Sequence, residues 1–141
     1  MIPTIAEASK LIAAKKLSPV ELTRACLDRM HSVDNQLHAF ILPTEERALA
    51  DAKAAEAEIM KSGPRGPMHG IPIGLKDIVD TKGIETTCQS KILAGNIPDA
   101  DATCAAKLAA AGTVLMGKLT THEFADGGPS FDTPKPPSRN P

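Results

Sequence analysis

The stretch IPIGLKDIV, residues 71–79, decides the fold, because apolar residues alternate there with small or charged ones as in a β-strand. Further along the chain, DATCAAKLAAAG (101–112) has the pattern of a short helix that Asp101 caps and Gly112 ends. The apolar run TVLMG (113–117) follows directly and predicts a second strand. A strand, a helix and a strand in this order favour an α/β fold.

The first part of the chain predicts mostly helices. Two capping-box patterns, each a Ser or Thr followed three residues later by Glu, precede apolar residues at helical spacing. A short extended segment is expected over 38–43 and an Ala-rich helix over about 44–61. We therefore divide the chain into an N-terminal helical region, 1–62, and an α/β region, 63–141. The capping pairs are Thr4 with Glu7 and Ser18 with Glu21.

The composition argues against several classes of protein. The chain has 141 residues, of which 2% are aromatic, and a formal net charge of −1. Such a charge gives no electrostatic attraction to nucleic acid or to an anionic membrane, so we expect neither as a direct partner. The apolar runs are too short to span a bilayer. Cys26, Cys88 and Cys104 show no C-x-x-C pairing, which indicates a reducing, cytoplasmic location.

Two motifs are similar to ligand sites but lack a required residue. GTVLMGKL (112–119) matches the phosphate-binding loop G-x-x-x-x-G-K-[ST], except that Leu119 stands where a hydroxyl is needed. HEFAD (122–126) begins like a zinc-protease helix, but Asp126 occupies the position of the second His. We interpret the first as a helix-to-strand junction and the second as a helix start or solvated turn, and we expect no metal and no cofactor.

Lys76 is the most informative residue of the predicted strand. It shares a face with Pro72 and Gly74, whose small side chains let a substrate or another backbone come close. If both faces of the sheet are covered, the ammonium is partly desolvated, and burial favours the neutral amine. A neutral lysine can serve as a general base. The alternative from the residues alone is a lysine on an edge strand that pairs with Asp77.

Three segments, in the order in which they occur here, resemble the amidase signature family. The resemblance covers nearly the whole chain. It implies the N-terminal part of a mixed-sheet α/β/α sandwich, in which residues 63–141 form the first part of the core. The segments are GPMHGIPIGLKDIVDTKGIETTCQSKIL (66–93), DATCAAKLAAAGTVLMGKLTTHEFA (101–125) and SRNP (138–141).

The resemblance also implies a chemistry and gives Lys76 the catalytic role. In this family a Ser–Ser–Lys triad hydrolyses carboxamides or transfers the ammonia released from them. The lysine deprotonates a bridging serine, which activates the nucleophilic serine, and backbone amides of a Gly/Ser-rich segment stabilise the oxyanion. The resemblance places that segment after Pro141, so we expect this chain to carry only the lysine and to be inactive alone.

The loop GGPSFD (127–132) comes before the expected Gly/Ser-rich segment, and in the family it borders the substrate pocket. We expect Gly128 and Asp132 to bind substrate, and a plain Gly/Pro turn is the alternative. Ser130 does not replace the catalytic serines, because it precedes their segment.

Three functions stay open from the sequence. The protein is a hydrolase of small-molecule amides, a non-catalytic fragment or interaction subunit, or the A subunit of a tRNA-dependent amidotransferase. Its expected partners are a second copy of itself or the remainder of the amidase chain.

Overall fold

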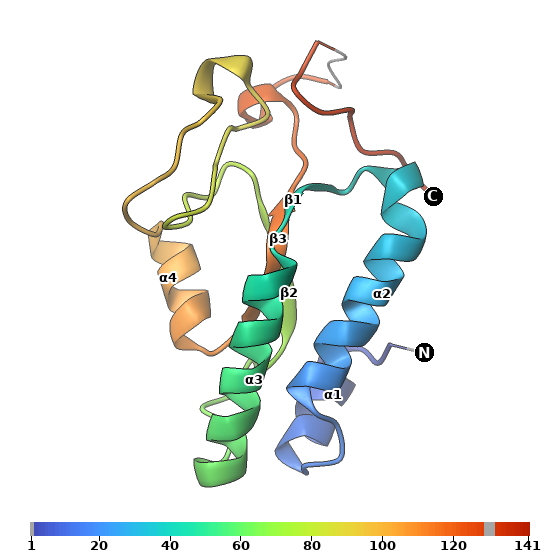
Figure 1. The fold of residues 1–141 in the computed structure, drawn as a ribbon, viewed down its shortest axis with the longest axis vertical. Coiled ribbons are helices and arrows are strands. Elements are labelled where there is room, and N and C mark those ends of the chain that lie inside the picture. Colours follow the sequence, from blue (N-terminus) through green and yellow to red (C-terminus); the bar gives the residue numbers. More distant parts are fainter. Residues whose placement is uncertain (1, 129–131) are drawn as a thin grey trace.

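A computed structural model of the chain describes residues 2–128 and 132–141. In these residues a three-stranded sheet runs between helices (Figure 1). The predicted α/β class is confirmed, and the sheet is mixed, with one antiparallel and one parallel strand pair. The elements are α1 (Ile5–Ala13), α2 (Pro19–Leu37), β1 (Phe40–Pro43), α3 (Glu45–Ser62), β2 (Pro72–Lys76), α4 (Thr103–Ala110) and β3 (Val114–Leu119), with short 3-10 helices η1 (Lys91–Leu93) and η2 (Glu123–Ala125).

Strand β3 is the centre of the sheet, and β2 lies at one edge. The strand order is β1-β3-β2, with β2 parallel and β1 antiparallel to β3. Five consecutive residues of β3, 114–118, are buried. The register between the parallel strands sets Leu75 opposite Lys118 and Lys76 opposite Leu119. The sequence thus predicted both parallel strands, and the extended segment expected over 38–43 contains β1.

The glycine before Lys118 is required by the close approach of β1. A Cβ on Gly117 would lie 2.5 Å from the carbonyl oxygen of Leu42, and the φ angle of Gly117 is 152°. Gly117 and Lys118 both pair with neighbouring strands. A phosphate-binding loop instead needs amides exposed at the start of a helix. The interpretation of 112–119 as a junction into a strand is therefore confirmed.

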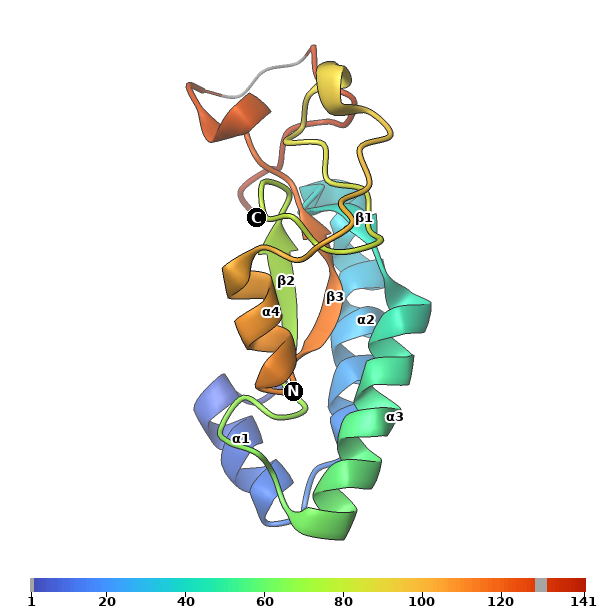
Figure 2. The ribbon, with the colours of Figure 1, turned by 90° about the vertical axis from the view of Figure 1, so that its left-hand side faces the viewer.

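Helices cover both faces of the sheet. Figures 1 and 2 show α4 on one side of the sheet and α2 on the other, with α3 beside α2. Aliphatic side chains from α1, α2, α3 and the sheet form the core, as the scarcity of aromatic residues requires. The buried members are Ala8, Ile12, Val20, Leu22, Leu27, Met30, Ala48, Ala52, Ile59, Ile71, Val114 and Met116.

Both predicted capping boxes are present. Ser18 Oγ accepts hydrogen bonds from the amides of Val20 at 3.0 Å and Glu21 at 3.2 Å, while Glu21 Oε2 accepts one from the Ser18 amide at 3.2 Å. Thr4 and Glu7 make the same reciprocal pair at the start of α1. An N-cap of this kind stabilises a helix by about 1 kcal/mol. Local sequence therefore specifies where α1 and α2 begin.

The prediction that Asp101 caps the helix that follows it is wrong. The N-cap of α4 is Ala102, and no side chain caps it. Asp101 Oδ1 instead accepts a hydrogen bond from the Lys82 amide at 2.7 Å. The carboxylate satisfies a donor in a turn that is distant in sequence, and this contact ties that turn to the start of α4.

The parallel pairing of β2 and β3 brings their carboxyl ends to the same edge of the sheet. The described segments that follow them, 77–98, 120–128 and 132–141, gather at this end, at the top of Figure 1. Open α/β sheets bind ligands in the loops at this end. Among the described residues, no helix combines the length and apolar character that crossing a membrane requires.

Candidate active site

Lys76 is the last residue of β2, with a fixed backbone and an exposed side chain. Its carbonyl oxygen accepts a hydrogen bond from the Val79 amide at 3.0 Å, and the amide of Asp77 donates to Leu119 O at 2.9 Å. The side chain makes no hydrogen bond or ion pair within the described part of the chain. The desolvation expected for Lys76 is therefore not produced by these residues.

The carboxylate next to Lys76 is paired with a different lysine. Asp77 and Lys118 are 1% and 0% exposed, and Lys118 Nζ lies 3.2 Å from Asp77 Oδ1. The alternative in which Asp77 pairs with Lys76 is therefore wrong, although β2 is an edge strand as that alternative required. The pairing follows from the register, because Lys118 extends from the buried strand beside the end of β2.

Three oxygen atoms surround the ammonium of Lys118. Besides forming the ion pair with Asp77, it donates hydrogen bonds to Val79 O at 2.9 Å and to Thr86 Oγ1 at 2.5 Å. Three donors are present only in the protonated form of lysine. Burial lowers the pKa of Lys118, and the Asp77 carboxylate acts in the opposite direction. The acceptors compensate for the loss of water around a charged group in the interior.

The second oxygen of Asp77 holds the loop 86–90. Asp77 Oδ2 accepts hydrogen bonds from the Thr87 amide at 3.0 Å and from Thr87 Oγ1 at 2.7 Å. The backbone contributes as well, because the Cys88 amide donates to Asp77 O at 2.9 Å. The residue after the candidate base therefore connects β2 to this loop through both its side chain and its backbone.

Strained backbone is concentrated at this end of the sheet. Cys88, Gln89, Phe124 and Ala125 have φ angles of 51°, 57°, 49° and 59°, in the left-handed region. The two strained pairs touch, since the Phe124 amide donates to Cys88 O at 2.9 Å. Such a conformation costs a non-Gly residue of the order of 1 kcal/mol or more, and it is often found at functional sites.

The predicted substrate-binding residues are Gly128 and Asp132, which the structure describes. Ser130, between them in sequence, lies outside the described residues. Gly128 is exposed. Asp132 is also exposed, and its Oδ1 lies 2.5 Å from the Nζ of Lys91, a hydrogen bond that lowers the pKa of Asp132. Gln89 Nε2 donates to Lys135 O at 2.8 Å, so the loop after β2 and the loop after η2 are in contact.

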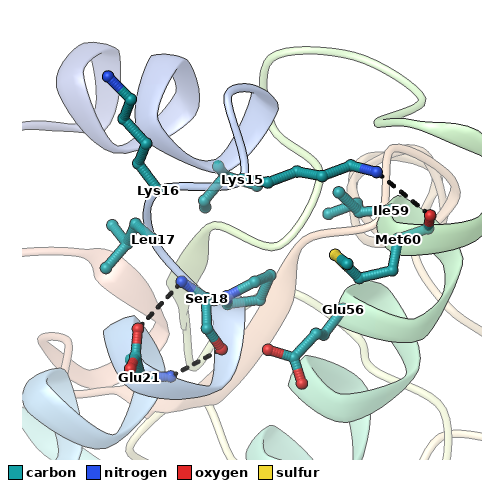
Figure 3. Close-up of a pocket in the computed structure, with 10 residues that line it drawn as sticks. Lys15, Lys16, Leu17, Ser18, Glu21, Glu56, Ile59 and Met60 are labelled. Atoms are coloured by element: carbon teal, nitrogen blue, oxygen red, sulfur yellow. Dashed lines mark hydrogen bonds between the residues drawn. The ribbon is translucent and has the colours of Figure 1, made fainter.

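Two cavities lie at different distances from the end of the sheet that carries Lys76. One of about 180 Å³ lies between the α1–α2 turn and α3 (Figure 3). Two of its polar side chains already stabilise the fold, because Lys15 Nζ donates to Met60 O at 3.3 Å and Ser18 caps α2. A second cavity, of about 160 Å³, is lined by Asp77 and Thr87 together with β1 residues. Of these two, the second lies at the end of the sheet that carries Lys76.

The segment HEFAD (122–126) does not form the helix of a zinc protease. His122 precedes η2, which is a single 3-10 turn rather than a protease helix. In the described part of the chain, no three His, Cys, Asp or Glu side chains cluster so that they could hold a metal ion.

Lys118 is the residue of this region that sequence reasoning did not single out. It was considered only within the near match to a phosphate-binding loop and within the family motif. A signal was available, because a charged residue inside an otherwise apolar strand needs a buried partner. Asp77, a carboxylate within the other predicted strand, was a candidate for that partner.

The chain is similar in sequence to proteins of one family over almost its whole length. The model of the Amidase family matches residues 21–141. The A subunit of the glutamyl-tRNA(Gln) amidotransferase of Geobacter sp. (strain M21) is 46% identical over 138 residues, which are 98% of this chain and 28% of that protein. The corresponding protein of Geobacter metallireducens is 48% identical, with equal coverage.

Solved structures agree with the sequence matches. A chain from a vestigial protein complex that reveals the origins of an s-triazine catabolic enzyme superposes with a TM-score of 0.92 and 32% identity, covering 99% of this chain and 31% of that one. The peptide amidase from Stenotrophomonas maltophilia gives a TM-score of 0.80 and 33% identity, covering 92% of this chain and 26% of that one. This chain thus spans less than a third of the proteins named here. The chain belongs to the amidase signature family.

Proposed function

We propose that the protein containing this segment cleaves the carbon–nitrogen bond of a carboxamide, with Lys76 as the general base of a Ser–Ser–Lys triad. The observation that carries the proposal is the contrast between two lysines on neighbouring strands. Lys118 is held inside the fold by two hydrogen bonds and by its ion pair with Asp77, whereas Lys76 stands at the end of β2 with no ion pair in the described part of the chain. Lys76 is thus available to exchange a proton with a hydroxyl.

The reaction balances with one lysine and two serines. Neutral Lys76 takes the proton of a bridging serine, which takes the proton of the nucleophilic serine as its oxygen attacks the amide carbonyl. The tetrahedral intermediate collapses, and the departing nitrogen leaves as ammonia or an amine with a proton returned through the same groups. Water then releases the acid from the acyl-enzyme. The family resemblance assigns both serines to a segment after Pro141, and Gly128 and Asp132 to the substrate pocket.

A second candidate function is the A subunit of a tRNA-dependent amidotransferase. Relatives of 40–48% identity carry that name. In this role the same chemistry frees ammonia from an amide, and a partner protein uses it. The present chain would contact no nucleic acid, in line with a net charge of −1. Copurification with a second protein that stimulates ammonia release supports this candidate, and full activity of a lone chain supports the free hydrolase.

The remaining proposals concern the substrate class, the location and the association of the protein. We propose a small-molecule amide as substrate, a cytoplasmic location, and association with a second copy or with the remainder of the amidase chain. Residues 1–141 alone are a non-catalytic fragment in this proposal. Purified residues 1–141 should therefore release no ammonia from simple amides, and turnover by this fragment would contradict it.

The test of the proposed chemistry uses the complete protein and a panel of small carboxamides. Lys76→Ala should lower kcat by at least about 100-fold, the contribution of a positioned general base. Lys82→Ala is the matched control, because Lys82 is exposed and its side chain makes no hydrogen bond or ion pair with the described residues. In hydroxylamine, the wild-type protein should form a hydroxamate from the acyl-enzyme. Undiminished turnover by Lys76→Ala would overturn the proposal.

A further inference from the structure

We propose that the buried Lys118–Asp77 pair is the positioning device for Lys76, so that Lys118 acts on catalysis without touching substrate. The inference rests on the proposed role of Lys76. The turn 76–79 starts at Lys76, the last residue of β2. Within that turn, the Val79 amide donates to Lys76 O at 3.0 Å, and Val79 O accepts from Lys118 Nζ at 2.9 Å.

Lys118 holds this turn from the neighbouring strand. Its ammonium reaches Asp77 Oδ1 at the start of the turn and Val79 O at the end of it. The backbone of β3 adds a third point, because Leu119 O accepts from the Asp77 amide at 2.9 Å. Lys76 directly precedes these contacts. Its Cα is therefore set by groups that belong to β3, whereas its own side chain remains unpaired in the described part of the chain.

The same pair connects the turn to the loop 86–90. Lys118 donates to Thr86 Oγ1, and Asp77 Oδ2 accepts from the amide and the hydroxyl of Thr87. This loop contains the strained residue Cys88, whose amide donates to Asp77 O. One charge pair thus fixes the strand end and the loop beside it relative to each other.

A purely structural role would not require this ion pair. The preceding side chains of β3, at 114–116, are apolar and buried. Replacing a buried ion pair by uncharged side chains of similar size is often neutral or even stabilising. Besides Asp77, the charged or titratable groups that raise the pKa of Lys118 are Asp80 and Cys88. The contacts of the pair instead converge on the turn that carries the candidate base.

The experiment compares variants of the complete protein. Lys118→Met leaves Asp77 as a bare buried charge, and that variant can fail to fold. The double variant Lys118→Met/Asp77→Asn removes both charges at nearly constant volume, and the side-chain amide oxygen that replaces the carboxylate can still accept from Thr87. Lys107→Met, at an exposed position of α4, is the matched lysine-to-methionine control. Thermal unfolding, kcat and KM are measured for each variant.

We expect the double variant to keep its stability and to lose catalytic rate. The double variant should unfold cooperatively near the wild-type temperature and keep KM within about threefold, yet lose at least about 100-fold in kcat, because small displacements of a catalytic group cost rates of this size. Lys107→Met should keep the wild-type kcat. A folded double variant with wild-type kcat overturns the positioning role while leaving the proposed chemistry intact. Undiminished activity of Lys76→Ala overturns both.

A second variant tests the positioning role even if the double variant does not fold. Thr87→Val removes one donor to Asp77 Oδ2 and the acceptor of the Gln89 amide, and it keeps the ion pair and the contact of the Thr87 amide with Asp77. It should lower kcat with little change in KM. A folded Thr87→Val protein with unchanged kcat counts against the positioning role.

Discussion

The imidazole of His69 occupies the space that a side chain on Gly112 would need. A Cβ on Gly112 would lie 2.2 Å from His69 Cδ2, and the φ angle of Gly112 is +81°. The backbones are joined too, because the Gly70 amide donates to Gly112 O at 2.8 Å. This contact connects the loop that leads into β2 with the junction that leads into β3, so it fixes where the two parallel strands begin.

Gly112→Ala should destabilise the complete protein by at least about 2 kcal/mol. Left-handed backbone costs a non-Gly residue about 1–3 kcal/mol, and the clash with His69 adds to that cost. Denaturant unfolding measures the loss. Gly83→Ala is the matched control, since Gly83 has a φ of +73° and open space around it. Equal losses at the two positions would show that strain alone, and not the packing of His69, explains the effect.

His69 should make stability depend on pH. Burial lowers the pKa of His69 below its ordinary value of 6.5, against the opposing effect of Glu58 and with a smaller lowering by Arg65. The unfolded chain therefore binds more protons than the folded one between the folded pKa and about 6.5. The stabilisation is fully present above pH of about 6.5, falls as the pH decreases, and is lost below the folded pKa.

The unfolding free energy as a function of pH checks this expectation. His69→Asn keeps an acceptor for the Arg65 amide, which donates to His69 Nδ1 at 3.0 Å. In this variant the fall below pH of about 6.5 should disappear. His122→Asn, at a position outside the core, should retain it. A pH profile that is the same for wild type and His69→Asn would assign the effect to other groups.

Asp132 should affect substrate binding more than stability. Its contact with Lys91 is exposed, and exposed ion pairs contribute little to stability. Asp132→Asn should leave the melting temperature unchanged and change KM for at least one amide in a panel. Lys91→Met tests the contact from the other side and should shift KM in the same direction. If neither variant changes any KM, the predicted substrate-binding role of Asp132 is wrong.

Thr87→Val should also destabilise the fold measurably. It deletes the 2.7 Å hydrogen bond to a carboxylate that is 1% exposed, and also the 3.1 Å hydrogen bond that the Thr87 hydroxyl accepts from the Gln89 amide. Hydrogen bonds to charged groups contribute about 1.5–3 kcal/mol, and a loss in this range is expected in denaturant unfolding. Thr113→Val, which removes a 3.0 Å bond to Leu108 O, is a neutral-acceptor control and should cost less. A larger loss at Thr113 would contradict this ranking.

Signals that depend on a few neighbouring residues were sufficient for much of the fold. The capping boxes at Thr4 and Ser18, and the alternation over 71–79, predicted α1, α2 and β2 without reference to the rest of the chain. Asp101 shows the limit of such reasoning. Its type and position suit an N-cap, but a donor from a remote turn competes for its carboxylate.

The sequence by itself determined the starts of α1 and α2, the strand–helix–strand order, the family, and the placement of Lys76 in a strand, because each depends on local pattern or on resemblance. The structure ends that strand at Lys76, three residues before the predicted end at 79. Only the tertiary structure decided that Asp77 pairs with Lys118 and leaves Lys76 unpaired in the described residues. The physical reason is the register of two parallel strands, which brings a buried ammonium and a buried carboxylate together from distant parts of the chain. Burial then makes that pairing obligatory, since neither charge has access to water.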